Sequence, residues 1–292
     1  MKRKTTREYL IFCAFVLPLF LPFVVFFIIP AVSGIIYSFF NWNGISSNMN
    51  FIGFKNFRNL LQDKVYITSM QFSSRFAVLS VVIGNILSML LALWVNTKIK
   101  SSNFIRAAFF MPMVICPVVK GFLWRFIYNQ GFTVLYKFIP LPFLNTKILA
   151  SGEAAFYGIL VASLWGGIGY NMIIYLAGLA SIDKTYYESA DIDGANSLTK
   201  FFRITIPMLM PSITICLFTS TASSFGIYDM NQALTVGGPG NSTLSMVLDI
   251  YNTGFLQNRL GYGSAKSVVL LIIIMTITFL QVSVTRKREV EL

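Results

Sequence analysis

Six long apolar stretches limit what this chain can fold into more than any other feature of its sequence. They cover residues 10–40, 72–95, 104–128, 154–180, 207–227 and 267–284. A helix needs about 20 apolar residues to cross a bilayer core that is about 30 Å thick. The pattern therefore predicts an all-α integral membrane protein with six transmembrane helices in a cell membrane.

The composition excludes most soluble proteins and most enzymes. Of the 292 residues, 55% are hydrophobic and 12% are charged, whereas about 25% are charged in an average soluble domain. The chain has no His and only 11 Asp and Glu, so it lacks the groups that most metal sites and acid–base pairs require. We expect no catalytic residue, no metal site and no cofactor bound by this chain. The three cysteines, Cys13, Cys116 and Cys216, lie inside apolar stretches and are interpreted as small hydrophobic residues.

The distribution of Lys and Arg predicts the orientation in the membrane. With the amino terminus inside, the inner segments carry 13 basic residues and the outer loops carry 6. Short cytoplasmic loops of membrane proteins are enriched in Lys and Arg, so we predict that both termini are cytoplasmic. The first apolar stretch exceeds the apolar core of a signal peptide, which is about 7–15 residues long, and is interpreted as a retained helix.

The net charge of +12 does not indicate nucleic acid binding. The basic residues form short clusters between apolar stretches, as cations that flank membrane helices do. Binding to nucleic acid would instead need them gathered on one solvated face with aromatic side chains between them. Membrane lipid, and not nucleic acid, is the expected contact.

One inner loop, residues 181–207, is more than a tight turn. Its polar first half predicts a short helix that is broken at Gly194, where a positive φ angle is favourable. A second short helix then leads to Pro207, which suits the first turn of the fifth span. A solvated connector is the simplest interpretation, but it would expose apolar side chains of the kind that mark a partner site: Tyr186, Tyr187, Ile192, Phe201 and Phe202.

The same loop resembles the EAA motif of permease subunits of ABC importers. The run Glu188-Ser189-Ala190 is followed by three residues and Gly194, then by nine residues and Ile204-Thr205-Ile206-Pro207. Ser189 replaces the usual central Ala, and Ile206 replaces the usual Leu. In that family the loop forms a coupling helix that docks on a cytoplasmic ATPase. The resemblance assigns ATPase coupling to Tyr187, Glu188, Ser189, Ala190, Asp193, Gly194, Ala195, Ile204 and Pro207.

Three further segments are similar to the carbohydrate-uptake branch of that family. Residues 234–243 contain Thr235 and the run Gly237-Gly238-Pro239-Gly240, and residues 261–265 read Gly-Tyr-Gly-Ser-Ala. The third stretch has Met-Pro at 111–112 with Arg106, Trp124 and Gly131 around it. The likeness extends over residues 10–285.

The resemblance implies a type I ABC importer permease that imports a sugar and is not itself an enzyme. It implies an amino-terminal tail, first helix and outer loop at 1–69, a transmembrane core at 70–285 and a cytoplasmic tail at 286–292. The implied partners are a second permease subunit in a heterodimer, two ATPase subunits that hold ATP and Mg, and an extracytoplasmic sugar-binding lipoprotein. The Gly-Gly-Pro-Gly loop, residues 237–240, is predicted to contact that binding protein or the sugar that leaves it, because its turn-forming residues favour a defined outer loop. The alternative is a packing turn that only orients the sixth span.

Polar side chains in the third, fourth and fifth stretches are the candidates for a substrate pathway. Sugars bind through hydrogen bonds to hydroxyl and amide groups and through stacking on aromatic rings. The candidates are Ser163, Trp165, Gly167, Tyr170, Asn171, Ser220, Ser223, Ser224, Tyr228, Lys120 and Arg125. Ser and Asn also form hydrogen bonds between helices. Lys120, Arg125, Arg75 and Lys266 have the further alternatives of reaching the interface or of pairing with Asp229 or Asp249.

Two other classes of membrane protein remain as alternatives. An ion-coupled secondary carrier would need carboxylates or His at the middle of its spans, and no Asp or Glu lies at the centre of any predicted span. A membrane-embedded enzyme would need a cluster of His, Asp or Cys, which the sequence does not contain. Both alternatives are therefore less favoured than the permease.

Overall fold

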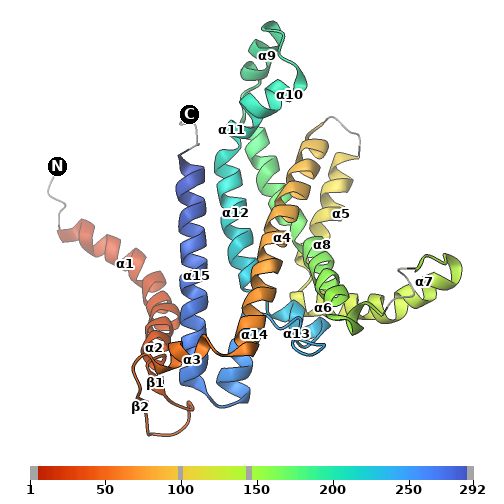
Figure 1. The fold of residues 1–292 in the computed structure, drawn as a ribbon. Helices are drawn as coiled ribbons and strands as arrows, with labels where there is room; N and C mark the ends of the chain where they lie inside the picture. Colours follow the sequence, from red (N-terminus) through yellow and green to blue (C-terminus); the bar gives the residue numbers. More distant parts are fainter. Residues whose placement is uncertain (1–5, 98–100, 143–146, 288–292) are drawn as a thin grey trace. The chain divides into compact units, whose positions relative to one another are not determined.

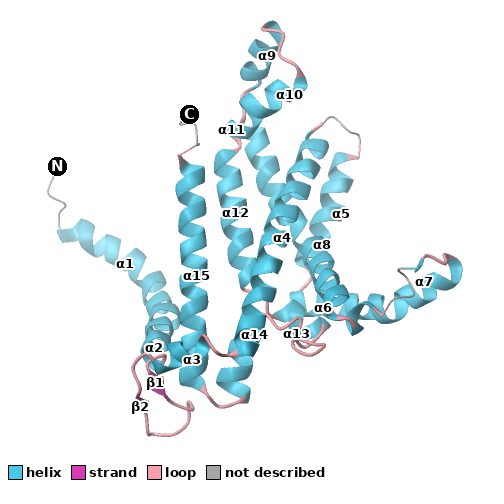
Figure 2. Ribbon diagram, in the orientation of Figure 1, coloured by secondary structure: helices cyan, strands magenta, loops and turns pink. Residues whose placement is uncertain are grey.

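A computed structural model describes residues 6–97, 101–142 and 147–287, and most of these residues are helical (Figure 2). The chain divides into two compact units, one formed by Met1–Asp63 and Ile250–Leu270 and the other by Lys64–Asp249 and Leu271–Leu292. Some of the cations behind the predicted orientation lie outside the described residues: Lys2, Arg3, Lys4, Lys98, Lys100 and Arg288.

The smaller unit begins with a helix that runs from Thr6 to Tyr37 (Figure 1). A π-helical turn interrupts it between Pro22 and Pro30, because neither proline has the amide hydrogen that a regular α-helix uses. A short antiparallel ribbon follows. The elements are α1 (Thr6–Phe23), η1 (Val24–Ile28), α2 (Ile29–Tyr37), β1 (Phe40–Asn41), β2 (Asn50–Phe51), α3 (Lys55–Leu60), η6 (Asn252–Leu256) and the first part of α15 (Leu260–Arg286).

Buried polar contacts connect the ribbon to the helices of the smaller unit. The side-chain amide of Asn56, on α3, donates to the carbonyl oxygens of Ser38 at 2.9 Å and Phe40 at 3.0 Å. The backbone N–H of Gly261 in α15 donates to the carbonyl of Trp42 at 2.9 Å. These bonds satisfy backbone groups that the two-residue strands leave unpaired.

The larger unit is a helical bundle in which α4 and α8 pack along each other and α12 packs against both (Figure 1). Helix α5 packs on α8, and α13 packs on α6. The elements are α4 (Lys64–Asn96), α5 (Ser102–Val114), α6 (Pro117–Phe126), η2 (Ile127–Gly131), α7 (Phe132–Phe138), η4 (Ile148–Ala150), α8 (Gly152–Ser181), α9 (Lys184–Ile192), α10 (Ser197–Lys200), η5 (Phe201–Thr205), α11 (Ile206–Met208), α12 (Met210–Phe225), α13 (Asp229–Leu234) and α14 (Met246–Tyr251).

Two apolar clusters form the core of this bundle. One gathers around Phe76 and Ile159, and the other around Met172 and Tyr175. Close backbone contact adds to the packing at Gly169, where a Cβ would overlap the carbonyl of Phe109 in α5. Small residues allow helices in a membrane to approach in this way, so that van der Waals contact replaces the hydrophobic driving force.

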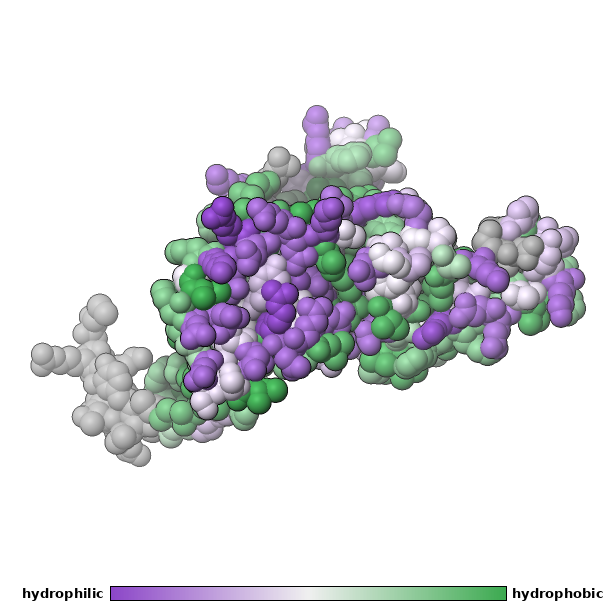
Figure 3. All heavy atoms as spheres, turned by 60° about the horizontal axis from the view of Figure 1, so that its bottom comes forward, coloured by the Kyte–Doolittle hydropathy of each residue, from purple (hydrophilic) through white to green (hydrophobic). Residues whose placement is uncertain are grey.

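Within the described residues, four helices are long and apolar enough to cross a membrane, and two bent helix pairs bring the number to six if each pair is one span. The four are Ala14–Tyr37, Lys64–Asn96, Gly152–Ser181 and Leu260–Arg286. Figure 3 shows that many hydrophobic residues lie at the surface of the structure, and the exposed large side chains include Phe15, Phe26, Leu90 and Phe279. The prediction of an all-α membrane protein is therefore confirmed.

The third predicted span is not the continuous helix that the apolar stretch suggested. Ser102–Val114 and Pro117–Phe138 meet at an angle of 100°. Ile115 and Cys116 between them are extended, with ψ angles of 131° and 138°. Proline disfavours helical angles in the residue before it and lacks an amide hydrogen, so Pro117 ends one helix and begins the next.

The fifth predicted span has a break of the same kind. Ser197–Met208 and Met210–Phe225 meet at 66°, and Leu209 lies between them. Pro211, and not Pro207 as expected, occupies the first turn of the long helix α12, whereas Pro207 lies in the short helix α11. The sequence located the apolar segment correctly but assigned its start to the wrong proline.

Candidate functional site

A cavity of about 480 Å³ lies inside the larger unit, between α4, α5, α6, α8, α12 and α13. Its volume is in the range of about 300–1,000 Å³ that is typical of sites for small molecules. Of the eleven residues predicted for a substrate pathway, the cavity is lined by Lys120, Ser163, Gly167, Tyr170, Asn171, Ser220, Ser223, Ser224 and Tyr228. The structure thus brings together residues that are up to about a hundred positions apart.

A connected set of neutral polar groups reaches the cavity wall through Asn171 and Ser220. Asn171 Nδ2 donates to Ser220 Oγ at 2.8 Å, and Asn85 Nδ2 lies 3.4 Å from the same oxygen. Tyr175 Oη donates to Asn85 Oδ1 at 2.8 Å. These bonds hold the side chains of three helices in fixed orientations, as positioned binding groups require. Asn171 and Ser220 join helices by hydrogen bonds and also line the cavity. The two interpretations from the sequence, contact between helices and a place on the substrate pathway, therefore both apply to them.

Two of the predicted pathway residues do not line the cavity. Trp165 packs edge-on against Trp124, with ring centroids 5.7 Å apart. Arg125 Nη1 lies 3.5 Å from the carbonyl oxygen of Ala233. Arg125 follows Lys120 by five positions, and five residues turn an α-helix by about 140°, so the two cations of α6 point in different directions.

The sequence analysis missed the contribution of α4 to the cavity. Ser80 and Gly84 of this helix line the wall, together with Thr219 and Asp229. Ser80 and Gly84 are four residues apart, and this spacing places small or polar residues on one face of a helix. The four-residue spacing could have indicated from the sequence that this face of α4 is special. It does not show which other helices that face packs against.

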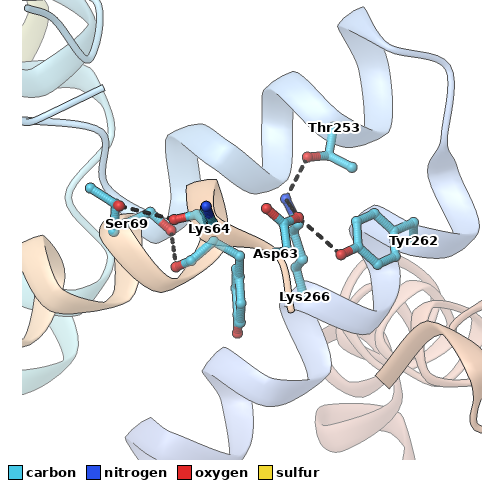
Figure 4. A network of polar contacts seen from close by, with 8 residues as sticks. Asp63, Lys64, Ser69, Thr253, Tyr262 and Lys266 are labelled. Atoms are coloured by element: carbon cyan, nitrogen blue, oxygen red, sulfur yellow. Dashed lines mark hydrogen bonds and ion pairs between the residues drawn. The ribbon is translucent and has the colours of Figure 1, made fainter. Parts of the chain in front are cut away.

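Two other membrane-helix cations have carboxylate partners that the sequence did not suggest. Arg75 forms a bidentate pair with Glu153, with N–O distances of 2.7 and 2.9 Å. In the smaller unit, Lys266 Nζ lies 3.4 Å from Asp63 Oδ2 and donates to Thr253 Oγ1 at 2.9 Å (Figure 4). Tyr262 Oη donates to the same Asp63 oxygen at 2.9 Å. The pairing of Arg75 with Asp229 or Asp249, which the sequence left open, is wrong.

The helix α9 is defined by hydrogen bonds at both ends. At its start Asp183 accepts from the backbone N–H of Thr185 at 2.9 Å and from its hydroxyl at 2.7 Å, and these bonds lower the pKa of the Asp183 carboxyl. At its end Ala195 N–H donates to the Ala190 carbonyl, and Gly194 N–H donates to the Asp191 carbonyl. This is a Schellman motif, and Gly194 has the positive φ of 74° that it requires.

The Schellman motif gives a physical reason for the spacing between Ala190 and Gly194. The residue with a positive φ angle follows the acceptor of the 6→1 hydrogen bond by four positions, which are the positions of these two residues. The predicted helix that is broken at Gly194 is therefore confirmed. The next helix, α10, begins at Ser197, and its N-cap Asn196 accepts from Thr199 N–H at 2.8 Å.

The loop around α9 has an inward and an outward side. Tyr187 Oη lies 3.0 Å from Thr205 Oγ1, and Lys200 forms an ion pair with Asp191 at 2.6 Å. Tyr187, Ala190, Ala195, Ile204 and Pro207 are half-buried. Glu188, Ser189, Asp193 and Gly194 are exposed, as are the apolar side chains of Tyr186, Ile192, Leu198 and Phe202.

The Gly-Gly-Pro-Gly loop is tightly constrained on one side and open on the other. Thr243, which is fully buried, donates from its hydroxyl to the Gly238 carbonyl at 2.6 Å. Gly237 is buried, has a φ of 83°, and lies against Leu244. Pro239 and Gly240 are exposed at the tip. Substitution of Gly237 would test packing, whereas substitution at the tip would test contact with a partner.

The fold and the cavity together define a polytopic helical membrane protein with a chamber between its helices that is lined by both apolar and polar side chains. A family model described as "Binding-protein-dependent transport system inner membrane component" matches residues 84–290. The chain belongs to this family. It is 37% identical over 291 residues to the probable starch degradation products transport system permease protein AmyD of Thermoanaerobacterium thermosulfurigenes, with 100% of this chain and 99% of that protein covered.

Other relatives and solved structures agree with this family assignment. The multiple sugar-binding transport system permease protein MsmF of Streptococcus mutans is 34% identical over 289 residues, with 99% of both chains covered. The sn-glycerol-3-phosphate transport system permease protein UgpA of Agrobacterium fabrum is 31% identical, with 91% of both chains covered. A bacterial ABC transporter for the acidic polysaccharide alginate has the same fold, with a TM-score of 0.82, 21% identity and 96% of both chains covered. The family assignment favours a permease over the ion-coupled carrier.

Proposed function

We propose that this chain is a permease subunit of an ABC importer and that the cavity between α4, α8 and α12 is the path of a sugar or oligosaccharide. The observation that carries the proposal is the cavity itself, because its wall offers amide, hydroxyl and tyrosine groups that suit a polyhydroxylated ligand. The names of two relatives, which mention starch degradation products and multiple sugars, support the substrate class.

The loop around α9 is the proposed contact with the ATPase. Its outward side combines the carboxylate of Glu188 with the exposed apolar side chains of Tyr186 and Ile192, and exposed apolar surface of this kind usually contacts a partner. In this proposal two ATPase subunits hold ATP and Mg, this chain holds neither, and both of its termini are cytoplasmic. Movement of α9 would shift the bundle between inward- and outward-facing states, which is a hinge-type transition.

The remaining partners are proposed on the same basis. A second permease subunit would complete a heterodimer, and an extracytoplasmic binding protein, anchored as a lipoprotein, would deliver the sugar. The exposed tip of the 237–240 loop is its proposed contact. One structure of similar fold is described as an alginate transporter in complex with a periplasmic protein that holds an alginate pentasaccharide, which supports this arrangement. The segments 1–69, 70–285 and 286–292 remain the proposed division of the chain.

Uptake into proteoliposomes tests the proposal. The complex should import a labelled starch oligosaccharide only when ATP is enclosed with the ATPases and the binding protein is present on the other side. Glu188→Lys should abolish this uptake without reducing the amount of permease in the membrane, whereas Lys64→Glu, far from the loop, should not. Uptake that follows an ion gradient and needs no ATP would contradict the proposal.

A further inference from the structure

One cation faces the cavity without a partner of opposite charge. Lys120 is 8% exposed and lines the cavity wall. Among the described residues its ammonium group forms no ion pair and no side-chain hydrogen bond. A Cβ built on Gly166 would lie 2.8 Å from Lys120 Nζ, so the ammonium group rests against the backbone of α8. Gly166 lines the same cavity.

Three other cations of the membrane helices contact an oxygen acceptor of the protein. Arg75 has Glu153 and Lys266 has Asp63 as carboxylate partners, and Arg125 lies beside the Ala233 carbonyl. Removing a charge from water is unfavourable unless another group compensates it. In the part of the chain that the structure describes, no such group contacts Lys120, and its side chain faces the cavity.

The carboxylate that lines the cavity does not neutralise Lys120. Asp229 is exposed, lies in the first turn of α13, and is farther than 4.0 Å from any Lys or Arg nitrogen in the described part of the chain. An exposed carboxylate keeps its hydration, so it has little need of a counter-ion. The described wall therefore contains one poorly hydrated positive charge and one hydrated negative charge.

We infer that the saccharide carried by this permease has an anionic group, a carboxylate or a phosphate ester, and that Lys120 binds this group in the cavity. The inference rests on the proposed function and specifies its substrate class. Charge-assisted hydrogen bonds to an ammonium are about twice as strong as neutral ones. The hydroxyl groups of the same ligand form hydrogen bonds with the uncharged side chains of Asn171 and Ser220.

The two parts of the wall lie within reach of one small ligand. Gly166, beside the Lys120 ammonium, and its neighbour Gly167 both line the cavity. Gly167 precedes Asn171 by four residues, which lie on one face of α8 and rise about 6 Å along it. A saccharide that places its acidic group against Lys120 therefore extends its ring hydroxyls along α8 toward Asn171. Lys120 therefore determines the specificity for an anionic sugar. The uncharged polar groups of Asn171 and Ser220 bind the hydroxyl groups of any sugar.

Binding of three matched sugars to the purified complex, without the binding protein, tests the inference. The probes are maltose, the maltose derivative whose terminal hydroxymethyl group is oxidised to a carboxylate, and maltose 6′-phosphate. Calorimetry on the wild-type complex should give a Kd for at least one anionic probe that is lower than that of maltose by on the order of tenfold. The two anionic probes distinguish a carboxylate from a phosphate.

Three variants separate the role of Lys120 from a general effect of charge. Lys120→Met keeps the length of the side chain and should bind all three sugars with the affinity of maltose, whereas Lys120→Arg should keep the preference. Arg125→Met removes a cation of the same helix that lies outside the cavity, and it should also keep the preference. Binding of maltose by Lys120→Met shows that this variant is folded.

The outcomes distinguish the inference from the proposed function. If wild-type complex binds maltose as tightly as the anionic sugars, or if Lys120→Met keeps the preference, the inference is wrong and the saccharide path stands. If Lys120→Arg loses the preference, the positive charge is not the determinant and the inference is also wrong. If no probe binds to the wild-type cavity, the proposed saccharide path itself fails.

Discussion

The loop around α9 and the cavity between α4, α8 and α12 are held in shape in opposite ways. The hydrogen bonds that cap the two ends of α9 join residues at most five positions apart, and its side-chain contacts with Lys200 and Thr205 span 9 and 18 positions. The polar cluster of the cavity joins residues that are 49, 90 and 135 positions apart. A change in the loop should therefore act locally, whereas a change in the cluster should weaken the packing of the whole bundle.

The largest effect on transport is expected from a substitution of Gly194. Gly194→Val places a β-branched residue at a φ of 74°. Gly adopts this left-handed conformation readily and Asn and Asp sometimes do, but other residues rarely adopt it. The Schellman motif should open, and ATP-driven transport should fall to background while the permease remains in the membrane. Uptake and membrane abundance, measured in parallel, check this result.

Two controls sharpen this prediction. Gly194→Asn should retain part of the activity, because Asn tolerates the left-handed conformation. Gly34→Ala should retain all of it, since Gly34 has an ordinary φ and open space around its Cα. Wild-type uptake by Gly194→Val would show that the local cap does not control coupling.

A smaller effect, on stability rather than on coupling, is expected at Tyr175. Tyr175→Phe removes the hydroxyl that donates to Asn85 Oδ1 and leaves a buried amide oxygen without this donor. A buried polar group that loses its partner costs about 1–3 kcal/mol, so the Tm of the purified complex should fall. The matched control is Tyr170→Phe, which alters an exposed cavity residue and should leave the Tm unchanged. An equal Tm for wild type and Tyr175→Phe would mean that the cluster does not hold the bundle together.

The smallest effect is expected at Asp183. Its carboxylate caps α9 and has a lowered pKa, so the cap is complete above the ordinary pKa of Asp and is lost as the pH falls through the lower, folded value. Transport should therefore show no dependence on Asp183 ionisation between about pH 5 and 8. Asp183→Ala should reduce uptake slightly and Asp183→Asn should restore it, because Asn is an equally good N-cap. Loss of activity in Asp183→Asn equal to that in Asp183→Ala would show that charge, and not capping, matters.

The difference between the two regions also explains how far the sequence alone could lead. Gly194, Asn196 and their neighbours determine local backbone geometry, so the break in the loop at residues 181–207 could be predicted. The polar residues of α8 and α12 could be proposed as a pathway, but their connection through Asn85 of α4 depends on tertiary packing. The bend at Cys116 was concealed because the apolar stretch continues through it, although Pro117 was a visible signal.

Charged pairs were the least predictable feature. Arg75 with Glu153 and Lys266 with Asp63 join residues that are 78 and about 200 positions apart. Nothing in the local sequence of either cation indicates its partner. The isolation of Lys120 was equally hidden, because a residue without a partner is recognised only when all neighbouring helices are in place.

Protection of a cysteine in the cavity tests the central claim most directly. In a permease whose native cysteines are replaced by Ser, a cysteine at Ser223 in the cavity wall and one at Ser47, between β1 and β2, are labelled with a water-soluble thiol reagent. Both positions are exposed, and neither belongs to the proposed ATPase contact, so both should react. Addition of the loaded binding protein and ATP should slow labelling at 223 and leave labelling at 47 unchanged by the sugar. Labelling at 223 that is the same with and without transported sugar would contradict the claim that the sugar passes through this cavity.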